Sequence, residues 1–373
     1  MTFLIVTHVV HKSLDGKIYG YAPYIREMNL WIPSFSKVIL IAPILEGLQP
    51  NPIEIPYEYP NIEAVAVHEI DLTHSLTAAR SFWALPRIVF KLAKAMNQAD
   101  HIHLRCPGNM GLLGCLVQIL FPAKKKTAKY AGNWDPKSDQ PFTYKLQQKI
   151  LNNPLLTKNM KALVYGNWPG TSDNILPFFT ATYSESEIEE KEKSFPAPGE
   201  PLRLIFVGSL VSGKNPMVAL ESLKLLVAQG FDVHLDVCGS GAQEGFLREF
   251  IRENQLAPYV TLHGNVDAAT LKKYYQNAHF LIFLSDSEGW PKVVAEAMFF
   301  GCLPITTSVS CVPDMLGFGQ RGDLIQKEPQ QVYRVIEYYT GNPEAYRNKS
   351  NKAREWSNHY TLELFQSEIL KLV

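Results

Sequence analysis

The chain has 373 residues, of which 46% are hydrophobic and 19% charged, and its 36 basic and 36 acidic residues cancel. This composition excludes a disordered or fibrous chain. Because a domain typically holds about 100–200 residues, the length indicates two domains with a large core. The five cysteines lack the paired short spacings of a disulfide framework or a zinc site, which favours a reducing compartment. The N-terminal apolar run follows no basic region and is too short to span a bilayer, so we expect a cytoplasmic protein without a transmembrane anchor.

The charge is uneven along the chain. Residues 1–184 hold 18 Lys/Arg against 12 Asp/Glu, whereas residues 185–373 hold 18 against 24. A basic half suits an anionic partner such as a phosphate or a lipid surface, and it suits a plain solvated surface equally well. Its basic run at 124–129 and the helical pattern around Arg87, Lys91 and Lys94 are more typical of a solvated face than of lipid contact, although contact with an anionic membrane surface stays open.

Short β-branched runs alternate with helical patterns through the first half of the chain. This rhythm predicts buried strands in a parallel α/β sheet. The expected strands cover 3–6, 37–42, 64–70, 101–104, 128–132 and 161–166. A long helix is expected over 78–98, with Pro86 at its start or at a kink.

The second half repeats the rhythm more regularly. Strands are expected at 202–208, 233–239, 260–264, 279–285 and 303–308, separated by helices. Between the halves, 183–201 is rich in charge, Ser, Pro and Gly and reads as a linker. The predicted architecture is therefore two doubly wound, Rossmann-like α/β domains facing a cleft, with ligands beyond the carboxyl ends of the strands.

Two loops of the second half carry glycines at expected strand ends. In "GSLVSGKN" (208–215) a helix start and Lys214 favour an anion, although a glycine turn with a solvated lysine explains the loop about equally well. Gly239 and Gly241 allow a ligand to approach the backbone, or form an ordinary turn. The first strand lacks the Gly-x-Gly-x-x-Gly pattern that follows it in dinucleotide oxidoreductases.

The segment "SEGWPKVVAEAMFFG" (287–301) holds Glu288 before an expected helix and Glu296 inside it. One interpretation is that these charges only stabilise the helix: Glu288 interacts favourably with the helix dipole, and Lys292 pairs with Glu296. The other is chemistry, because carboxylates accept strong hydrogen bonds from sugar hydroxyls. A sugar nucleotide carries hydroxyls at both ends of a diphosphate. The segment offers a carboxylate for each set of hydroxyls and, between them, a helix N-terminus for the diphosphate.

The stretch "SEGWPKVVAEAMFFGCLPI" resembles the glutamate-x7-glutamate motif of the retaining group 1 glycosyltransferases, family 4, with the GT-B fold. The resemblance covers 202–325, where "FVGSLVSGKNP", "LDVCGSG", "VTLHGNV" and "SVSCVPDMLGFGQRGDLI" follow in the family's order. It implies an acceptor-binding domain at 1–182, a linker at 183–201, a nucleotide-sugar-binding domain at 202–355, and a C-terminal helix at 356–373 that packs back towards the first domain.

The resemblance also implies roles for individual residues. Glu296 corresponds to the residue that binds the ribose, Glu288 to the one facing the donor sugar, and Lys214 to the lysine that neutralises the diphosphate. The other implied donor-binding residues are Gly16, Ser209 (where arginine is common), Gly239, Gly241, Gly289, Trp290, Lys292 and Val293.

The catalytic group implied by the resemblance is Lys214, Glu288 and a histidine near the reacting carbon. His103 is the candidate for that histidine; it is equally compatible with a hydrogen-bonded core residue, and His8 and His11 compete for the role.

The predicted function is that of a retaining, metal-independent glycosyltransferase of the hexosyltransferase type in polysaccharide biosynthesis. It would move a sugar from a nucleotide-diphosphate sugar to a hydroxyl of a glycan or lipid-linked acceptor, at the inner face of the membrane, with no cofactor and no nucleic acid. A sugar-nucleotide epimerase of the same architecture and a non-catalytic two-domain sugar-binding protein are the alternatives.

Overall fold

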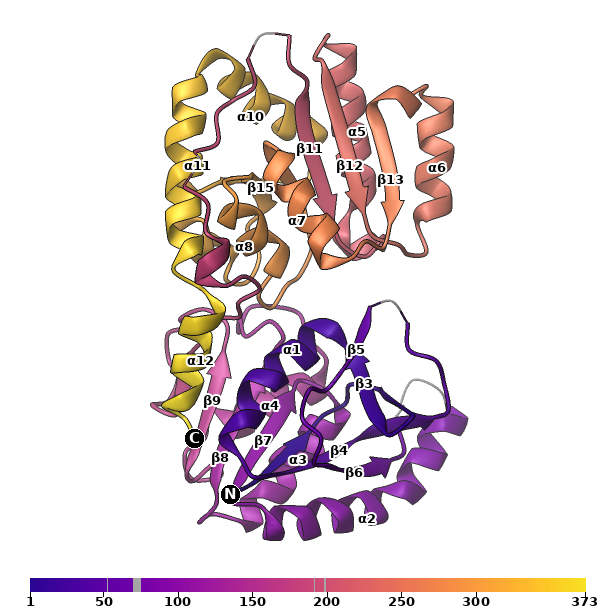
Figure 1. Cartoon of the computed structure of the whole chain (residues 1–373), viewed down its shortest axis with the longest axis vertical. Coiled ribbons are helices and arrows are strands. Elements are labelled where there is room, and N and C mark those ends of the chain that lie inside the picture. Colours follow the sequence, from indigo (N-terminus) through magenta and orange to yellow (C-terminus); the bar gives the residue numbers. More distant parts are fainter. Residues whose placement is uncertain (52, 70–74, 191, 198) are drawn as a thin grey trace. The chain divides into compact units, whose positions relative to one another are not determined.

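The computed structural model describes residues 1–51, 53–69, 75–190, 192–197 and 199–373, and only the backbone of 75–82. The chain divides into two compact units (Figure 1). The first unit is Met1–Phe179 together with Phe365–Val373, and the second is Thr180–Leu364.

The first unit is built on a mixed sheet. Its described strands are β1 (Thr2–Val6), β2 (His11–Leu14), β3 (Lys17–Tyr21), β4 (Lys37–Glu46), β5 (Glu54–Pro56), β6 (Ile62–Val67), β7 (His101–Cys106), β8 (Lys125–Tyr130), β9 (Met160–Val164) and β10 (Ile175–Pro177). They lie in the order β10-β9-β8-β7-β1-β4-β2-β3-β5, with β6 beside β4. All pairs are parallel except β2 with β3 and β3 with β5. Apolar side chains make β1 and β4 buried central strands, as their β-branched runs predict.

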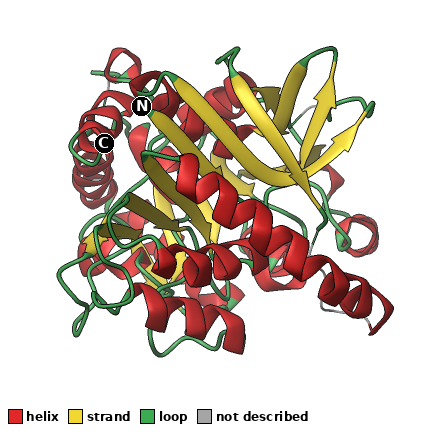
Figure 2. Ribbon diagram, turned by 90° about the horizontal axis from the view of Figure 1, so that it is seen from below, coloured by secondary structure: helices red, strands yellow, loops and turns green. Residues whose placement is uncertain are grey.

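Helices cover this sheet (Figure 2). They are α1 (Ala22–Trp31), α2 (Ser75–Gln98), α3 (Asn109–Val117) and α4 (Phe142–Leu151), with short 3₁₀ turns at Ile32–Ser34 and Gln118–Leu120. Ile88, Leu92 and Met96 recur at helical spacing on α2 and join the core formed with the sheet, and Pro86 lies inside the helix. The C-terminal helix α12 (Leu362–Leu370) begins in the second unit and ends in the first.

The second unit has a fully parallel sheet in its described residues. Its strands are β11 (Leu202–Val207), β12 (Val233–Cys238), β13 (Val260–Gly264), β14 (Phe280–Phe283), β15 (Leu303–Thr307) and β16 (Asp323–Ile325), in the order β13-β12-β11-β14-β15-β16. Its helices are α5 (Pro216–Ala228), α6 (Glu244–Glu253), α7 (Ala268–Asn277), α8 (Lys292–Phe299), α9 (Val312–Met315), α10 (Pro329–Gly341) and α11 (Pro343–Asn358), with 3₁₀ turns at Glu185–Glu187, η4 (Ser212–Lys214), Ala257–Tyr259 and Gly317–Gly319.

The predicted fold class, two doubly wound α/β domains, is confirmed. The short strands β5, β10 and β16 and the β2–β3 hairpin were not predicted, because such short strands with few consecutive apolar residues leave little periodic signal.

The polar segment 183–201 lies within the second unit. Lys193 Nζ donates to the backbone oxygens of Tyr275, Gln276 and Ala278 at 2.7–2.9 Å. Phe195 packs edge-on against Phe280 and Tyr346. One lysine and one phenylalanine thus anchor a stretch whose composition resembles a linker, since composition does not register a few strong local contacts.

Candidate functional site

The sheet of the second unit reverses its strand order between β11 and β14. These two strands are adjacent and parallel, with Leu204 opposite Phe280, and the order 3-2-1-4-5-6 is that of a doubly wound nucleotide-binding sheet. Loops leaving the carboxyl ends of two strands at such a switch point diverge to opposite faces of the sheet and leave a crevice for a ligand. The loops after β11 and β14 are the two that carry Lys214 and Glu288.

Backbone and side-chain hydrogen bonds join these two loops. Asn215, in the left-handed conformation with φ of 51°, donates from Nδ2 to the Leu284 carbonyl at 2.8 Å and to Asp286 Oδ1 at 2.9 Å. The Asp286 N–H donates to the Gly213 carbonyl at 2.9 Å, and Ser285 Oγ donates to the same oxygen at 3.2 Å. The loops are therefore one rigid unit, which fixes where their charged side chains lie.

Lys214 and Glu288, 74 residues apart in sequence, form an ion pair through Nζ and Oε1. Their side chains are 27% and 11% exposed, so both are mostly desolvated, and Lys214 Nζ lies 5.3 Å from the ring centre of Phe283. A partly buried charge needs a partner, and these two residues partner each other. The pair holds one cation and one carboxylate at the switch point.

Glu296 lies one turn inside α8 and is held at both oxygens. Thr182 Oγ1 donates to Oε1 at 2.8 Å and Tyr275 Oη donates to Oε2 at 3.1 Å. Burial, followed by the nearby Glu296 charge, raises the pKa of Tyr275 well above its usual value, so this hydroxyl stays protonated and remains a donor. Glu296 and Lys292 line a small pocket with Thr180 and Tyr360.

The residues between the two glutamates are supported from other elements. The Gly289 carbonyl accepts hydrogen bonds from Ser310 Oγ at 3.2 Å and Cys311 Sγ at 3.1 Å. Trp290 packs in an aromatic cluster, 6.1 Å from the Trp356 ring and 5.9 Å from the Tyr360 ring. Lys292 and Val293 open helix α8 and are half-buried. The segment between the two glutamates is therefore held in place by other parts of the second unit without a ligand.

Gly239 and Gly241 have a structural explanation. A Cβ atom at Gly239 would lie 1.9 Å from the Gly208 carbonyl oxygen, and one at Gly241 would lie 2.5 Å from that of Leu210. These two glycines let the loops after β11 and β12 approach each other closely, which explains them without a ligand. Ser209 is exposed at this strand end.

The structure contradicts the catalytic hypothesis for His103. This histidine is fully buried in the middle of β7; its Nδ1 contacts Thr127 Oγ1 at 2.9 Å and its ring lies 4.9 Å from Trp31. Burial, followed by the nearby charges of His101, Arg105 and Lys129, lowers its pKa well below the usual value. His103 is a neutral core residue, the alternative left open by the sequence.

His8 occupies the corresponding switch point of the first unit. The strand order there reverses between β1 and β7, and His8 follows the carboxyl end of β1. It is exposed, and a Cβ atom at Gly108, just after β7, would lie 2.7 Å from His8 Nδ1. Partial desolvation of the ring by its neighbours, and then the charge of Arg105, lower the pKa of His8, so the imidazole is neutral near neutral pH. His11 is fully buried, with its Nε2 3.1 Å from Tyr57 Oη.

Gly16 does not lie in a glycine-rich loop. It forms the tip of the β2–β3 hairpin with Asp15, both at positive φ (73° and 49°). Two such residues are what a type I′ turn requires. This turn accounts for Gly16, and the structure removes the reason for giving it a donor-binding role.

The basic run 124–129 is only in part a solvated face, because Lys125 is exposed whereas two of its lysines are buried. Lys126 and Lys129 are buried in β8 at 2% and 0% exposure. Lys126 Nζ donates to the Phe121 carbonyl at 2.9 Å, and Lys124 Nζ to those of Asn97 and Ala99. These lysines satisfy backbone oxygens at the ends of neighbouring segments.

Sequence reasoning missed the residues that hold the site from a distance. Thr182 and Tyr275 carry no local signal, because they act on Glu296, which lies 114 and 21 residues away from them in the sequence. Asn215 could have been found, since an Asn-Pro pair is a turn signal and asparagine tolerates the left-handed conformation. Among the described residues, no group of three or more His, Cys, Asp or Glu side chains is arranged to hold a metal ion.

No helix in the described ranges is both long and apolar enough to cross a bilayer.

These features define a pair of Rossmann-like units with a charged switch point in the second. Residues 187–356 match the family model described as glycosyl transferases group 1. The chain is 29% identical over 171 residues to the putative colanic acid biosynthesis glycosyltransferase WcaL of Salmonella typhimurium, and 27% identical over 187 residues to the capsular polysaccharide biosynthesis glycosyltransferase CapM of Staphylococcus aureus. These matches cover 44% and 49% of the chain and only 42% and 46% of the two relatives.

Solved structures are similar over the whole chain. The Anabaena protein HepE, solved in complex with UDP, has a TM-score of 0.70 at 11% identity and covers 100% of this chain and 99% of its own. Sucrose-phosphate synthase from Thermosynechococcus elongatus has a TM-score of 0.69 at 16% identity, with 100% and 98% coverage. Similarity at this identity concerns the fold, which is GT-B. Together the comparisons show the GT-B fold for the whole chain and a likeness to the group 1 glycosyltransferases for residues 187–356.

Proposed function

We propose that this protein is a retaining glycosyltransferase that moves a sugar from a nucleotide-diphosphate sugar to a hydroxyl of a glycan or lipid-linked acceptor in polysaccharide biosynthesis. The main support is the Lys214–Glu288 ion pair, which sits where a doubly wound sheet binds its ligand and inside the family's domain. The names of the relatives WcaL and CapM support the biosynthetic context.

The donor half of the reaction follows from charge. Cleavage of the sugar–phosphate bond leaves negative charge on the diphosphate, and Lys214 is the cation at the switch point that would stabilise it. Oriented cations in a dry site are effective because they need no reorganisation as charge develops. When a diphosphate binds Lys214, the Lys214–Glu288 ion pair would break and Glu288 would accept hydrogen bonds from the donor sugar hydroxyls. Glu296 would bind the ribose.

No metal or cofactor is required in this proposal, because Lys214 and the N-terminus of α8 supply the positive charge. Gly289, Trp290, Lys292 and Val293 would contact the sugar and phosphate, with Ser209, Gly239 and Gly241 forming the neighbouring loop walls. The first unit would bind the acceptor, and His8, at the switch point of that unit, would replace His103 as the candidate catalytic histidine. We place the reaction in the cytoplasm.

A thermal-shift screen with UDP, GDP, ADP and CMP sugars tests the donor assignment. We expect stabilisation by one nucleotide series and its loss in Glu296→Ala, while the unliganded melting temperature of the variant stays close to that of the wild type. The absence of a shift with every nucleotide sugar would contradict the proposal. NMR of the product then separates transfer with retention from epimerisation of the donor without acceptor.

A further inference from the structure

Three polar side chains connect strands β12 and β13 to helix α7 in the second unit. His263 Nε2 lies 2.7 Å from Asp236 Oδ1, and the Tyr274 hydroxyl lies 3.0 Å from His263 Nδ1. The centres of the His263 and Tyr274 rings are 4.5 Å apart. The side chains of His263 and Asp236 are 19% and 14% exposed, so both are mostly desolvated. We call Asp236, His263 and Tyr274 the α7 link.

The chemistry of each group sets the direction of the two hydrogen bonds. A carboxylate only accepts, so Asp236 takes the hydrogen bond from Nε2–H and leaves Nδ1 of the neutral ring as an acceptor. Partial desolvation, and then the neighbours Cys238 and Asp236, raise the pKa of Tyr274, so its hydroxyl stays protonated and donates to Nδ1. Both ring nitrogens of His263 therefore have a partner, one on β12 and one on α7.

An irregularity of strand β13 places His263 in this link. β13 lies at one end of the strand order, and it pairs with β12 so that Val237 is opposite Leu262 but Cys238 is opposite Gly264. His263 is therefore an extra residue without a counterpart on β12, as in a β-bulge. Bulges on edge strands redirect a side chain, and here the redirected side chain is the one that reaches α7.

Helix α7 carries the link and the contact to Glu296 on consecutive residues. Tyr274 bonds to His263, whereas Tyr275 is fully buried and donates to Glu296 Oε2 at 3.1 Å. Successive helical side chains point about 100° apart, so one can reach the strands while the next reaches α8. A shift of α7 that breaks the bond of Tyr274 therefore moves the Tyr275 hydroxyl away from Glu296.

His234 provides a comparison on the same strands. Its Nε2 lies 3.0 Å from Thr261 Oγ1 and 3.9 Å from Asp236 Oδ1. Both partners belong to β12 and β13, and among the described residues His234 has no hydrogen bond to α7. His234 thus shares the surroundings of His263 without the tie to the helix.

We propose that His263 is a positioning residue for nucleotide binding. It ties α7 to Asp236 on β12 and thereby keeps the Tyr275 hydroxyl where it orients Glu296 for the ribose. The inference rests on the proposed function, because it needs Glu296 to bind the nucleotide. It adds a residue that acts through α7 and not by contact with the ligand.

Isothermal titration with UDP, GDP and ADP tests the proposal, with the nucleotide that binds the wild type most tightly used for the variants. His263→Gln removes the acceptor of the Tyr274 bond, and Tyr274→Phe removes its donor. Each should weaken nucleotide binding about three- to fivefold at unchanged kcat, which is within the loss expected for one hydrogen bond. Unchanged affinity in both variants would overturn the inference alone, whereas a wild type that binds none of the nucleotides would contradict the proposed function and the inference with it.

A double-mutant cycle separates positioning from a general loss of structure. In Tyr275→Phe the hydroxyl that α7 positions is already absent, so adding His263→Gln should weaken binding less than about 1.5-fold further. The same three- to fivefold loss from His263→Gln in both backgrounds would show that His263 does not act through Tyr275, and would overturn the proposal.

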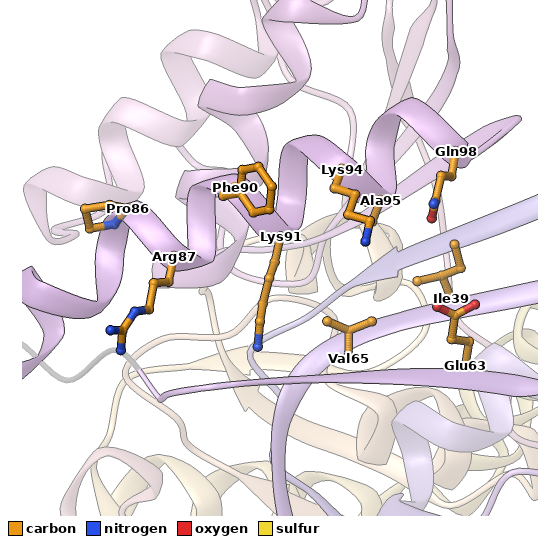
Figure 3. A pocket seen from close by; sticks show the side chains of 10 residues that line it. All are labelled: Ile39, Glu63, Val65, Pro86, Arg87, Phe90, Lys91, Lys94, Ala95 and Gln98. Atoms are coloured by element: carbon orange, nitrogen blue, oxygen red, sulfur yellow. The ribbon is translucent and has the colours of Figure 1, made fainter.

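Two variants serve as controls. His234→Gln changes the same strands without touching a bond to α7. Lys91→Met removes a tie between a helix and a strand in the first unit, where Lys91 lines a pocket of about 590 Å³ beside α2 (Figure 3) and its Nζ donates to the Ala66 carbonyl at 2.7 Å. Both variants should bind the nucleotide as tightly as the wild type. A loss in either control equal to that of His263→Gln would mean that any loosened helix or strand lowers affinity, and would overturn the proposal.

Discussion

The sheet is mixed in the first unit and parallel in the second, yet the chain reverses its strand order at the equivalent point of each, between β1 and β7 in the first and between β11 and β14 in the second. In the second unit, β11 and β14 each lead through a short loop into a helix, so charged residues at the strand ends fall at the switch point. In the first unit, β1 is followed by the β2–β3 hairpin, and the residues at the switch point are His8 and Gly108.

In both units, the position of a charged residue along a strand distinguishes residues of the candidate site, which lie beyond a strand end, from residues of the core, which lie inside a strand. Lys214 and Glu288 lie beyond strand ends and pair with each other. His103, Lys126 and Lys129 lie inside strands β7 and β8, are buried, and bond to neighbouring protein groups. The predictions below test this distinction, from the largest expected effect to the smallest.

Removing the cation of the second switch point should have the largest effect. We expect Lys214→Ala to lower kcat by about 10²–10³, the usual loss on removing one group that stabilises developing charge. The free energy of unfolding should fall by about 1–3 kcal/mol, because Glu288 is only 11% exposed and loses its partner. Steady-state kinetics and urea unfolding measure the two quantities.

The control for this change is Lys327→Ala. Lys327 pairs with Asp286, two residues before Glu288, and both side chains are about half exposed. Activity within about twofold of the wild type is expected. An equal loss of kcat in both variants would mean that any positive charge near this loop supports activity, and would contradict a specific role for Lys214.

Removing the buried lysine of β8 should instead affect stability. Lys129 Nζ donates to the Phe179 carbonyl at 2.9 Å and lies 4.6 Å from the ring centres of Tyr165 and Phe178. Lys129→Ala leaves a cavity and a buried carbonyl without this donor, which should lower the free energy of unfolding by about 2–4 kcal/mol. Lys129→Met, which keeps the stem, should cost less. A stable Lys129→Ala protein with low kcat would contradict a structural role.

Two histidines of the first unit form a matched pair. We expect His8→Gln to lower kcat by about tenfold to a hundredfold at unchanged stability, and His103→Gln to lower stability at unchanged kcat per folded molecule. Normal turnover in His8→Gln would remove this residue from the proposed site. Loss of turnover in a stable His103→Gln protein would restore the hypothesis that the structure rejects.

The same pair predicts a pH dependence. An unfolded chain protonates a histidine near its ordinary pKa of about 6.5, whereas burial keeps His103 neutral to much lower pH and lowers the pKa of His101 to about 4. The unfolded state therefore binds more protons below about pH 6.5, and the free energy of unfolding falls as the pH drops through this window. Urea unfolding at stepped pH should show a shallower decline in His103→Gln. An unchanged slope would contradict a neutral buried His103.

The smallest effect is expected from the hydroxyls that orient Glu296. Tyr275→Phe removes one hydrogen bond to the carboxylate, and Thr182→Val removes the other. Each should weaken nucleotide binding about three- to tenfold at little cost in kcat, because one hydrogen bond contributes about 1 kcal/mol and the second hydroxyl still holds the carboxylate. Isothermal titration measures the binding. A larger loss of kcat than of affinity would indicate a role for Glu296 beyond binding.

Much of the second unit could be predicted because its signals are local. The regular alternation of apolar runs and helices identified five of its strands, and the spacing of Glu288 and Glu296 around a helix start suggested a site. The first unit was harder, because the Asp15–Gly16 hairpin interrupts the alternation and the polar residues of β7 and β8 look the same in sequence whether they face solvent or the core.

The sequence by itself determined the fold class and the chemical types at the second switch point, because strand and helix periods and the residues at strand ends are properties of short segments. Only the tertiary structure decided which of these residues meet. It paired Lys214 with Glu288, held Glu296 between Thr182 and Tyr275, and enclosed His103 and Lys129 in the core. Burial and long-range pairing depend on how segments pack, so no short window of sequence contains them.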